Sequence, residues 1–296
     1  MYIVIVNSHS GKRRYNFILK QLSTFLHKPF LTYIASEYQE ETMWIEIDNK
    51  LLDLKGQVKG FIIIGGDGTL HYTVQKLYHH NLPFGVIPSG SGNDFGRALK
   101  IPKNTKKAIL RINQQNINKY DLLEINGKKV LSIIGIGVDA ETAIHCQTSR
   151  IKRLLNMAFL GRLTYLAVFL KTVFRYRSKD ITINNEEGCS FRFKRVWLMA
   201  LGNTSYYGGG IPICPSANPQ DGKIHVVIVH NLNIAQLLLA LPTVFFKKHL
   251  SLPYVKTLEG RSFTISTENI PIQGDGEELG VAPATINILH KAIEFY

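Results

Sequence analysis

Short apolar runs alternate with amphipathic segments along the first 120 residues of the chain. Segments between these runs have the polar and apolar spacing of helices, from about Arg13 to His27, across Glu40–Leu51, and after Thr69. Strands that alternate with helices predict a mostly parallel sheet, and hence a doubly wound α/β domain. The runs predicted to be buried strands are Tyr2–Val6, Phe30–Ile34, Phe61–Ile64 and Phe84–Ile87.

The pattern changes near residue 120, where short alternating runs replace the helical segments. Tyr120–Ile125 and Lys128–Ile134 flank Asn126-Gly127, the favoured two-residue turn of a β-hairpin. We therefore predict two domains, an α/β domain over residues 1–121 and an antiparallel β domain over 122–281. We leave open whether the segment from about 282 to 296 returns to the first domain. Further strands are predicted at Ile181–Ile183, Phe191–Ala200, Ile224–Val229, Ser262–Ser266 and Thr285–Leu289.

Two long apolar stretches interrupt the second domain. Leu154–Leu170 contains Arg162, and Leu232–Phe246 contains Pro242. Both fall short of the roughly 20 apolar residues that span a bilayer. The surrounding region 150–177 is basic and, like all of Thr142–Lys179, has no Asp or Glu. Two interpretations stay open, a helix that docks on an anionic membrane and a core helix with one solvated face.

The formal net charge of +13 calls for an anionic partner. The basic residues of 150–177 are interleaved with Leu, Phe, Tyr and Val, which favours a membrane surface and not nucleic acid. Three scattered cysteines form no disulfide framework, and the apolar N-terminus is too short for a signal peptide. We therefore expect a cytoplasmic protein that associates peripherally with the inner face of the cell membrane.

Two glycine-rich turns follow consecutive predicted strands. Gly65–Thr69 reads Gly-Gly-Asp-Gly-Thr, and Ser89–Asp94 reads Ser-Gly-Ser-Gly-Asn-Asp. Each alone is compatible with an ordinary turn. Together they lie where parallel sheets bind ligands, and bare backbone N–H groups at such turns bind phosphate. Each turn also supplies a carboxylate, Asp67 and Asp94, so the pair predicts a Mg²⁺–nucleotide site.

Three common nucleotide-binding motifs are excluded. Gly11-Lys12 is followed by Arg13 and lacks the spacing of a Walker A loop. The glycines of Gly90–Gly96 are misplaced by one residue for a dinucleotide fingerprint. Gly135–Ala140 fits that fingerprint, but no carboxylate follows between Glu141 and Asp180 to bind a ribose.

The order of motifs along nearly the whole chain resembles the diacylglycerol kinase catalytic family, and especially its bacterial diacylglycerol and lipid kinases. Gly-Gly-Asp-Gly-Thr is shared with NAD kinases, whereas the full series is specific. Two positions depart from the family pattern: Ser8 replaces a proline and Ser91 a threonine. The series comprises Asn7-x-x-Ser10-Gly11, Gly65–Thr69, Pro88–Gly96, Gly135–Ala140, Leu201–Asn203, Gly208–Gly210, Pro215–Gly222 and Asp275–Glu277.

The resemblance implies a Rossmann or phosphofructokinase-like α/β domain that binds ATP, followed by a β-sandwich domain that binds lipid. It places Asp67, Asp94 and Asp121 in a network around an active-site Mg²⁺. The residues implied to line the ATP site are Asn7, Gly11, Gly65, Gly66, Asp67, Gly68, Thr69, Ser89, Gly90, Ser91 and Asn93.

In the second domain the resemblance makes Asp275 the catalytic base, supported by Glu277. It also implies a structural Mg²⁺ held by Asp221, with backbone oxygens near Asn218 and Lys223. Taken from the residues alone, Asp275-Gly276 and Asp221-Gly222 are equally compatible with plain turns. An alcohol that attacks a phosphate does need a positioned carboxylate, and Asp275 has the right chemistry if the second domain closes over the nucleotide.

These observations predict an ATP- and Mg²⁺-dependent lipid kinase, with diacylglycerol as the first expected substrate. Other lipid alcohols (phosphatidylglycerol, a sphingoid base or an isoprenoid alcohol) stay open. The alternatives are an NAD kinase-like enzyme and a non-catalytic lipid- or nucleotide-binding module. The expected partners are the lipid and an anionic membrane surface, with no nucleic acid. Apolar surface on the second domain leaves room for a homodimer.

Overall fold

A computed structural model describes residues 1–8, 15–38, 41–148 and 161–296 of the chain. They form two compact units, Met1–Tyr120 with Lys291–Tyr296, and Asp121–His290. The chain passes from one unit to the other within strand β5 (Asn118–Ile125) and returns within strand β15 (Ala284–Phe295). Because the last residues belong to the first unit, that unit contains both ends of the chain.

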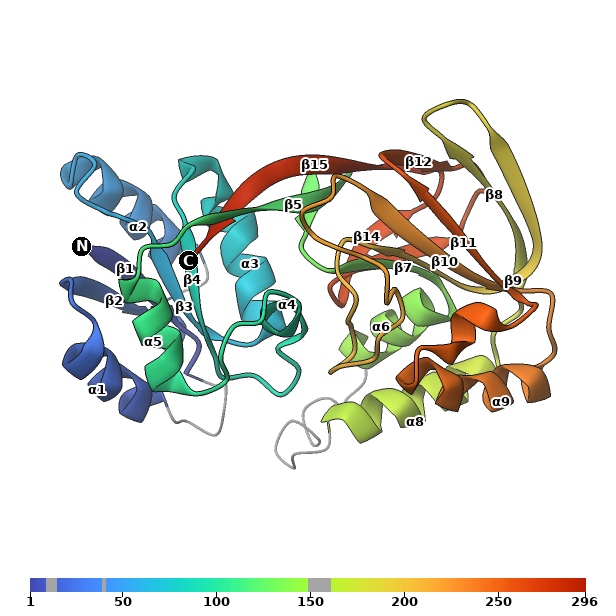
Figure 1. Cartoon of the computed structure of the whole chain (residues 1–296), viewed down its shortest axis with the longest axis horizontal. Coiled ribbons are helices and arrows are strands. Elements are labelled where there is room, and N and C mark those ends of the chain that lie inside the picture. Colours follow the sequence, from blue (N-terminus) through green and yellow to red (C-terminus); the bar gives the residue numbers. More distant parts are fainter. Residues whose placement is uncertain (9–14, 39–40, 149–160) are drawn as a thin grey trace. The chain divides into compact units, whose positions relative to one another are not determined.

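The first unit is built on a parallel sheet in the order β2-β1-β3-β4, to which the end of β15 adds beside β4. Among the described residues of this unit, two short 3-10 turns (η) and five α-helices connect or flank the strands (Figure 1). The elements are β1 (Tyr2–Val6), α1 (Tyr15–Phe25), β2 (Phe30–Ile34), η2 (Ala35–Glu37), α2 (Thr42–Asp53), β3 (Phe61–Gly65), α3 (Asp67–Leu77), η3 (Tyr78–His80), β4 (Phe84–Pro88), α4 (Asp94–Ala98) and α5 (Thr105–Asn113).

Side-chain alternation along β1 explains why helices cover both faces of this sheet. Tyr2, Val4 and Val6 point to one face and pack with α1 and α5, through residues such as Leu22 and Ile109. The alternate side chains of β1 are equally buried, and α2 and α3 lie on their side of the sheet (Figure 1). The predicted doubly wound α/β fold is confirmed.

The second unit is antiparallel. In its main sheet β9 pairs with β7, β8 and β10, while β13 joins β7 to β14 and β12 joins β8 to β15. Besides parts of β5 and β15, the elements are β6 (Lys128–Val130), β7 (Ile133–Gly137), α6 (Val138–Thr148), α8 (Gly161–Val173), β8 (Lys179–Asn185), β9 (Ser190–Gly202), β10 (Ile224–His230), α9 (Ile234–Phe245), η4 (Lys248–Ser251), β11 (Val255–Gly260), β12 (Ser262–Ile265), β13 (Pro271–Gly274) and β14 (Glu277–Val281).

Two apolar clusters lie on the two faces of β9. Val196, Met199 and Leu201 join a core made almost entirely of strand residues, which is the interior of the expected β-sandwich. Trp197 and Leu198 join a second core with residues of α6, α8 and α9. The β-sandwich prediction is confirmed, and a layer of helices covers one of its outer faces (Figure 1).

The basic region 150–177 is described only from Gly161 onward, so Arg150, Lys152 and Arg153 lie outside the described residues. Within α8, Phe169 and Val173 are buried in the helix-covered core, and Lys171 is exposed. The described part of the region is therefore a packed helix that also presents basic side chains. None of the helices formed by the described residues is long and apolar enough to cross a bilayer.

One predicted element is wrong in its extent. The second strand of the hairpin, expected over Lys128–Ile134, is divided into β6 and β7 by a break at Leu131-Ser132. The turn itself is as predicted, with left-handed φ values of 50° at Asn126 and 76° at Gly127. At the break, backbone N–H groups bond to the side chain of Asp275 and not to a neighbouring strand.

Candidate functional site

Two glycine-rich turns of the first unit touch each other through their backbones. Gly66 connects β3 to α3, and Gly90 follows β4. A Cβ atom added to Gly90 would lie only 2.4 Å from the Cα of Gly66. The Ser89 N–H donates to the Gly65 carbonyl at 2.9 Å. The structure thus brings together the two turns that the sequence predicted as walls of one phosphate site.

The end of β1 joins the same turns. The side-chain amide of Asn7 donates to Thr69 Oγ1 at 2.9 Å. Asn93 adopts a left-handed conformation with φ of 54°, accepts from the Gly90 N–H at 3.1 Å and donates to the Gly90 carbonyl at 2.7 Å. Ser91 is exposed in this turn, and Gly11 lies outside the described residues.

We call the two glycine-rich turns, Gly65–Thr69 and Ser89–Asp94, the phosphate cradle. The hydroxyl of Ser89 in this cradle is positioned to bind a ligand. Its oxygen is buried, and among the described residues it has no hydrogen-bond partner. The same pair of turns includes the N-terminus of α3, where the helix dipole favours negative charge. Buried hydroxyls normally find partners, so a phosphate oxygen fits this position.

Asp67 and Asp94 lie in adjoining turns of this cradle. Asp67 is the first residue of α3, and its Oδ1 accepts from the N–H of Phe95 at 3.2 Å. Asp94 is buried and pairs with the guanidinium of Arg97. Carboxylate oxygens beside a phosphate cradle are the donor set that Mg²⁺ prefers, so these two residues fit a magnesium ion.

In the second unit, Asp275 and Gly276 form the two-residue turn between β13 and β14. Their φ values of 51° and 90° are those of a hairpin turn of the favoured primed type. The carboxylate of Asp275 accepts from the backbone N–H groups of Leu131, Ser132 and Ile133 at 2.7, 2.9 and 3.3 Å. The turn predicted from the residues alone is therefore present, and its aspartate is held in a fixed orientation.

A buried polar network supports this turn, and the sequence analysis assigned it no role. Gln273 accepts from the Gly276 N–H at 2.9 Å and donates to Asp139 Oδ2 at 2.7 Å. Asp139 is 1% exposed and bonds to the phenol of Tyr207, whose pKa is raised by burial and by that carboxylate. The signal that could have identified it is an aspartate two residues after the second glycine of Gly135–Ala140, in the first turn of the helix that follows a strand.

Glu277 follows the turn as the first residue of β14 and is exposed. Its expected role in supporting Asp275 stays a prediction.

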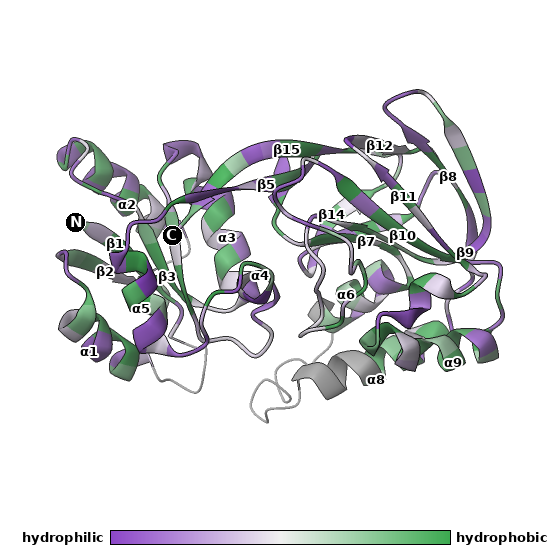
Figure 2. Cartoon of the chain, viewed as in Figure 1, coloured by the Kyte–Doolittle hydropathy of each residue, from purple (hydrophilic) through white to green (hydrophobic). Residues whose placement is uncertain are grey.

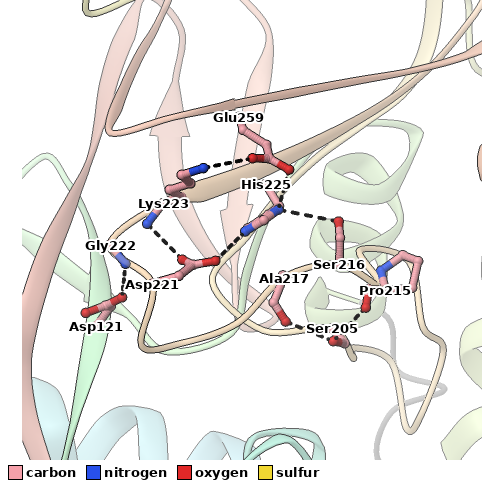
Figure 3. A network of polar contacts seen from close by, with 10 residues as sticks. All are labelled: Asp121, Ser205, Pro215, Ser216, Ala217, Asp221, Gly222, Lys223, His225 and Glu259. Atoms are coloured by element: carbon pink, nitrogen blue, oxygen red, sulfur yellow. Dashed lines mark hydrogen bonds and ion pairs between the residues drawn. The ribbon is translucent and has the colours of Figure 1, made fainter.

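Asp121 and the loop around Asp221 form a second polar network (Figure 3). Asp121 is fully buried, and its carboxylate binds the Gly222 N–H at 2.8 Å and the His290 ring at 2.9 Å. It thereby anchors the loop expected to hold a structural metal. Its place in a magnesium network with Asp67 and Asp94 stays a prediction.

Asp221 itself is engaged by hydrogen bonds within that loop (Figure 3). Its Oδ1 accepts from the Lys223 N–H at 3.0 Å, and its Oδ2 lies 2.9 Å from His225 Nε2. The other ring nitrogen of His225 faces Glu259 at 3.4 Å. A metal bound by Asp221 and by the carbonyl oxygens of Asn218 and Lys223 would have to share the Asp221 carboxylate with these two hydrogen bonds. The structural metal site also stays a prediction.

An apolar cavity of about 240 Å³ lies in the second unit between the sheet and its helical layer. Apolar cavities of roughly 150 Å³ already accept benzene. His249 is a rare polar residue in its wall; its Nε2–H donates to the Ile213 carbonyl at 2.9 Å, and burial lowers its pKa. The wall consists mainly of hydrophobic side chains, among them Phe169, Leu198, Val229, Leu237, Ala240 and Val244.

The outer side of the same helical layer carries exposed apolar residues. Leu239, Phe245 and Phe246 on and after α9 are 76%, 63% and 74% exposed. Lys247 and Lys248 follow at once and are also exposed. Figure 2 shows α9 as largely hydrophobic along its length. We call these five residues the α9 patch.

Comparisons with known proteins agree with this arrangement. The sequence model described as "Diacylglycerol kinase catalytic domain" matches residues 1–125, and the one described as "YegS C-terminal NAD kinase beta sandwich-like domain" matches residues 132–296, more than half of the chain. A protein named diacylglycerol kinase from Staphylococcus carnosus is 27% identical over 296 residues, covering 99% of this chain and 94% of that protein.

Solved structures show the same fold. A crystal structure of a diacylglycerol kinase from Bacillus anthracis superimposes with a TM-score of 0.70 at 19% identity, covering 99% of this chain and 95% of the other. At that identity the likeness concerns the fold, and the activity must be argued from the site.

Proposed function

The chain belongs to the diacylglycerol kinase family of lipid kinases, and from that membership we propose that it transfers the γ-phosphoryl group of ATP to diacylglycerol, giving phosphatidic acid. The observation that carries the lipid part is the apolar cavity of the second unit. A soluble acceptor such as NAD would meet almost no polar partner there, whereas an acyl chain gains about 0.8 kcal/mol per buried CH₂ group.

The first unit binds the nucleotide in this proposal. The N-terminus of α3, which follows Gly66, and the Ser89 hydroxyl receive the phosphates. Asp67 and Asp94 would hold Mg²⁺, which when bound neutralises negative charge on the phosphate oxygens. Because phosphoryl transfer requires mainly positioning and charge stabilisation, a rigid cradle of this kind is suited to it.

The second unit supplies the lipid site and the base. Asp275 accepts the proton of the attacking hydroxyl, and three backbone N–H groups keep its carboxylate in one orientation. A chain of contacts runs from Gly276, the residue after Asp275 in the turn, through Gln273 and Asp139 to Tyr207 in the wall of the cavity. The lipid-binding surface and the base are thereby held in one hydrogen-bonded framework.

The α9 patch is the proposed contact with the membrane that contains the substrate. Leu239, Phe245 and Phe246 would enter the interface, where each buried side chain contributes about 1.5–3 kcal/mol. Lys247 and Lys248 would face anionic headgroups at roughly 1 kcal/mol each. Peripheral attachment to the cytoplasmic face of the cell membrane follows from this proposal.

A pair of variants on α9 tests the lipid assignment. Ala240 lines the cavity, and Ala240→Phe should fill part of it. We expect KM for a long-chain diacylglycerol to rise about tenfold, since roughly 1.4 kcal/mol of lost burial gives that factor. KM for ATP should not change. Ala235 lies on the same helix but is exposed, so Ala235→Phe is the matched control. Equal KM values for the lipid in both variants would exclude the cavity as the acyl site.

A further inference from the structure

Three potential metal ligands meet on the surface of the first unit, on α2 and η3. Asp48 belongs to α2, and His79 and His80 form the end of η3, the turn that continues α3. Among the residues that the structure describes, they are the group of three His, Cys, Asp or Glu side chains whose ligand atoms all lie within 4.8 Å of one another. The His80 Nε2 and Asp48 Oδ1 atoms are 2.8 Å apart.

The packing of α2 against α3 holds these side chains together. Lys76 of α3 forms an ion pair with Glu41 at 2.8 Å, next to α2. The rings of Trp44 and Tyr72 are in edge contact, with centroids 5.6 Å apart. With the two helices fixed in this way, the following turn brings His79 and His80 to Asp48, and the two imidazole rings lie 4.0 Å apart between centroids.

An ordinary imidazole–carboxylate contact explains why His80 and Asp48 lie together, but it does not explain the position of His79. The Asp48–His80 pair needs no third partner, yet a ligand atom of His79 lies within reach of both. His79 is exposed, and the other two are partly exposed, so an ion can reach the group from solvent. Two imidazoles and one carboxylate form the donor set that binds zinc and neighbouring transition metals in preference to magnesium.

We propose that Asp48, His79 and His80 form a binding site for a divalent transition-metal ion of the zinc class. With three protein ligands, the ion would keep at least one position for water. The site would link α2 to the end of α3, the helix whose N-terminus carries the phosphate-binding turn. Its expected effect is to stabilise the first unit, and it depends neither on ATP nor on a lipid substrate.

The test uses the full chain after removal of metals with a chelator. Cys189 is exposed, and thiolates are zinc ligands, so every protein carries Cys189→Ser to remove this second source of binding. Equilibrium dialysis against ZnCl₂ should show one equivalent more in the parent protein than in His79→Gln or Asp48→Asn. ZnCl₂ should raise the melting temperature of the parent by about 3 °C or more, and MgCl₂ at the same concentration should not reproduce this shift.

The matched control is His27→Gln, which changes another exposed histidine of the first unit. It should retain both the extra equivalent of zinc and the thermal shift. His79 is exposed, so His79→Gln should melt at the same temperature as the parent in the absence of metal. The proposal is overturned if His79→Gln and Asp48→Asn bind as much zinc as the parent, or if the parent binds zinc with no thermal shift.

Discussion

At the scale of single residues, a close backbone contact between Gly66 and Gly90 joins the two glycine-rich turns of the candidate site. No side chain larger than hydrogen fits between the two turns, because a Cβ on Gly90 would meet the Gly66 backbone at 2.4 Å. The sequence showed that both turns follow strands, which was enough to predict one shared site. It could not show their contact, because that depends on the pairing of β3 with β4.

Gly90→Ala should therefore separate the two turns. We expect a loss of about 1–3 kcal/mol in unfolding free energy from the forced backbone shift, and a weaker affinity for ATP. Urea unfolding and nucleotide titration measure the two effects. Gly68→Ala is the control for stability, since a Cβ there meets no atom within 4 Å. Equal destabilisation by both variants would contradict the role given to the contact.

Asp275 combines two roles, a turn residue and the proposed base. Asp275→Asn keeps the shape of the side chain but loses the proton-accepting carboxylate. We expect phosphoryl transfer to fall by about 10²–10⁴-fold while ATP binding persists, because general-base catalysis contributes a factor of that order. The amide also loses part of its bonding to the N–H groups of Leu131–Ile133, so the melting temperature should be measured alongside.

Glu278→Gln is a suitable comparison for this variant. Glu278 is an exposed carboxylate on β14 next to the same turn, and we have given it no role. It should retain normal activity. Turnover of Asp275→Asn equal to that of Glu278→Gln would remove Asp275 from the mechanism.

At the scale of elements, the break between β6 and β7 shows where sequence patterns reach their limit. Lys128–Ile134 has the composition of one strand, and the Asn126-Gly127 turn before it was predicted correctly. The break forms because N–H groups at Leu131 and Ser132 bond to a carboxylate more than 140 positions later in the chain. The local pattern of residues 128–134 contains no information about an acceptor so far along the chain.

The helix α9 illustrates a different limit. Its apolar stretch with Pro242 was recognised as too short to cross a membrane, but the pattern did not show which side chains are buried. In the structure, Leu237 and Val244 pack in the core, whereas Leu239 and Phe245 are exposed. The contact of the helix with β9 and β10 determines this division.

Removing the apolar residues of the α9 patch should release the protein from membranes. We expect the triple variant Leu239→Ser, Phe245→Ser and Phe246→Ser to lose at least about tenfold in binding to vesicles of phosphatidylglycerol, since one lost anchor is worth more than 1.4 kcal/mol. Co-sedimentation measures this binding. Leu52→Ser, at a position 75% exposed in the first unit, should bind as the parent does. If the triple variant bound the vesicles as the parent does, the α9 patch would be excluded as the membrane-binding surface.

At the scale of the whole molecule, the alternation of strands and helices was sufficient to predict both the α/β unit and the antiparallel unit. The strands β11 and β14 were not predicted, because they are short and have exposed residues at several positions. The sequence analysis left open whether the segment from about 282 to 296 returns to the first domain. In the structure Lys291–Tyr296 belongs to the first unit, where Phe295 packs against Phe84 and Phe95.

The distribution of roles between the two units is also a property of the whole molecule. Glycine-rich turns, which have local sequence signatures, were found from the sequence in the first unit. The apolar cavity of the second unit has no such signature, because its wall is assembled from α6, α8, α9 and strands far apart in the chain. The nucleotide half of the proposed activity was therefore more predictable than the lipid half.

The most direct test of the proposed reaction is to incubate the protein with γ-labelled ATP, Mg²⁺ and an equimolar mixture of diacylglycerol, other lipid alcohols and NAD, and to identify the labelled product. We predict that the label appears in phosphatidic acid and that Asp275→Asn gives almost none. Label on another lipid alcohol would contradict the assignment of diacylglycerol. Label on NAD alone, or on no acceptor at all, would contradict the account of this protein as a lipid kinase.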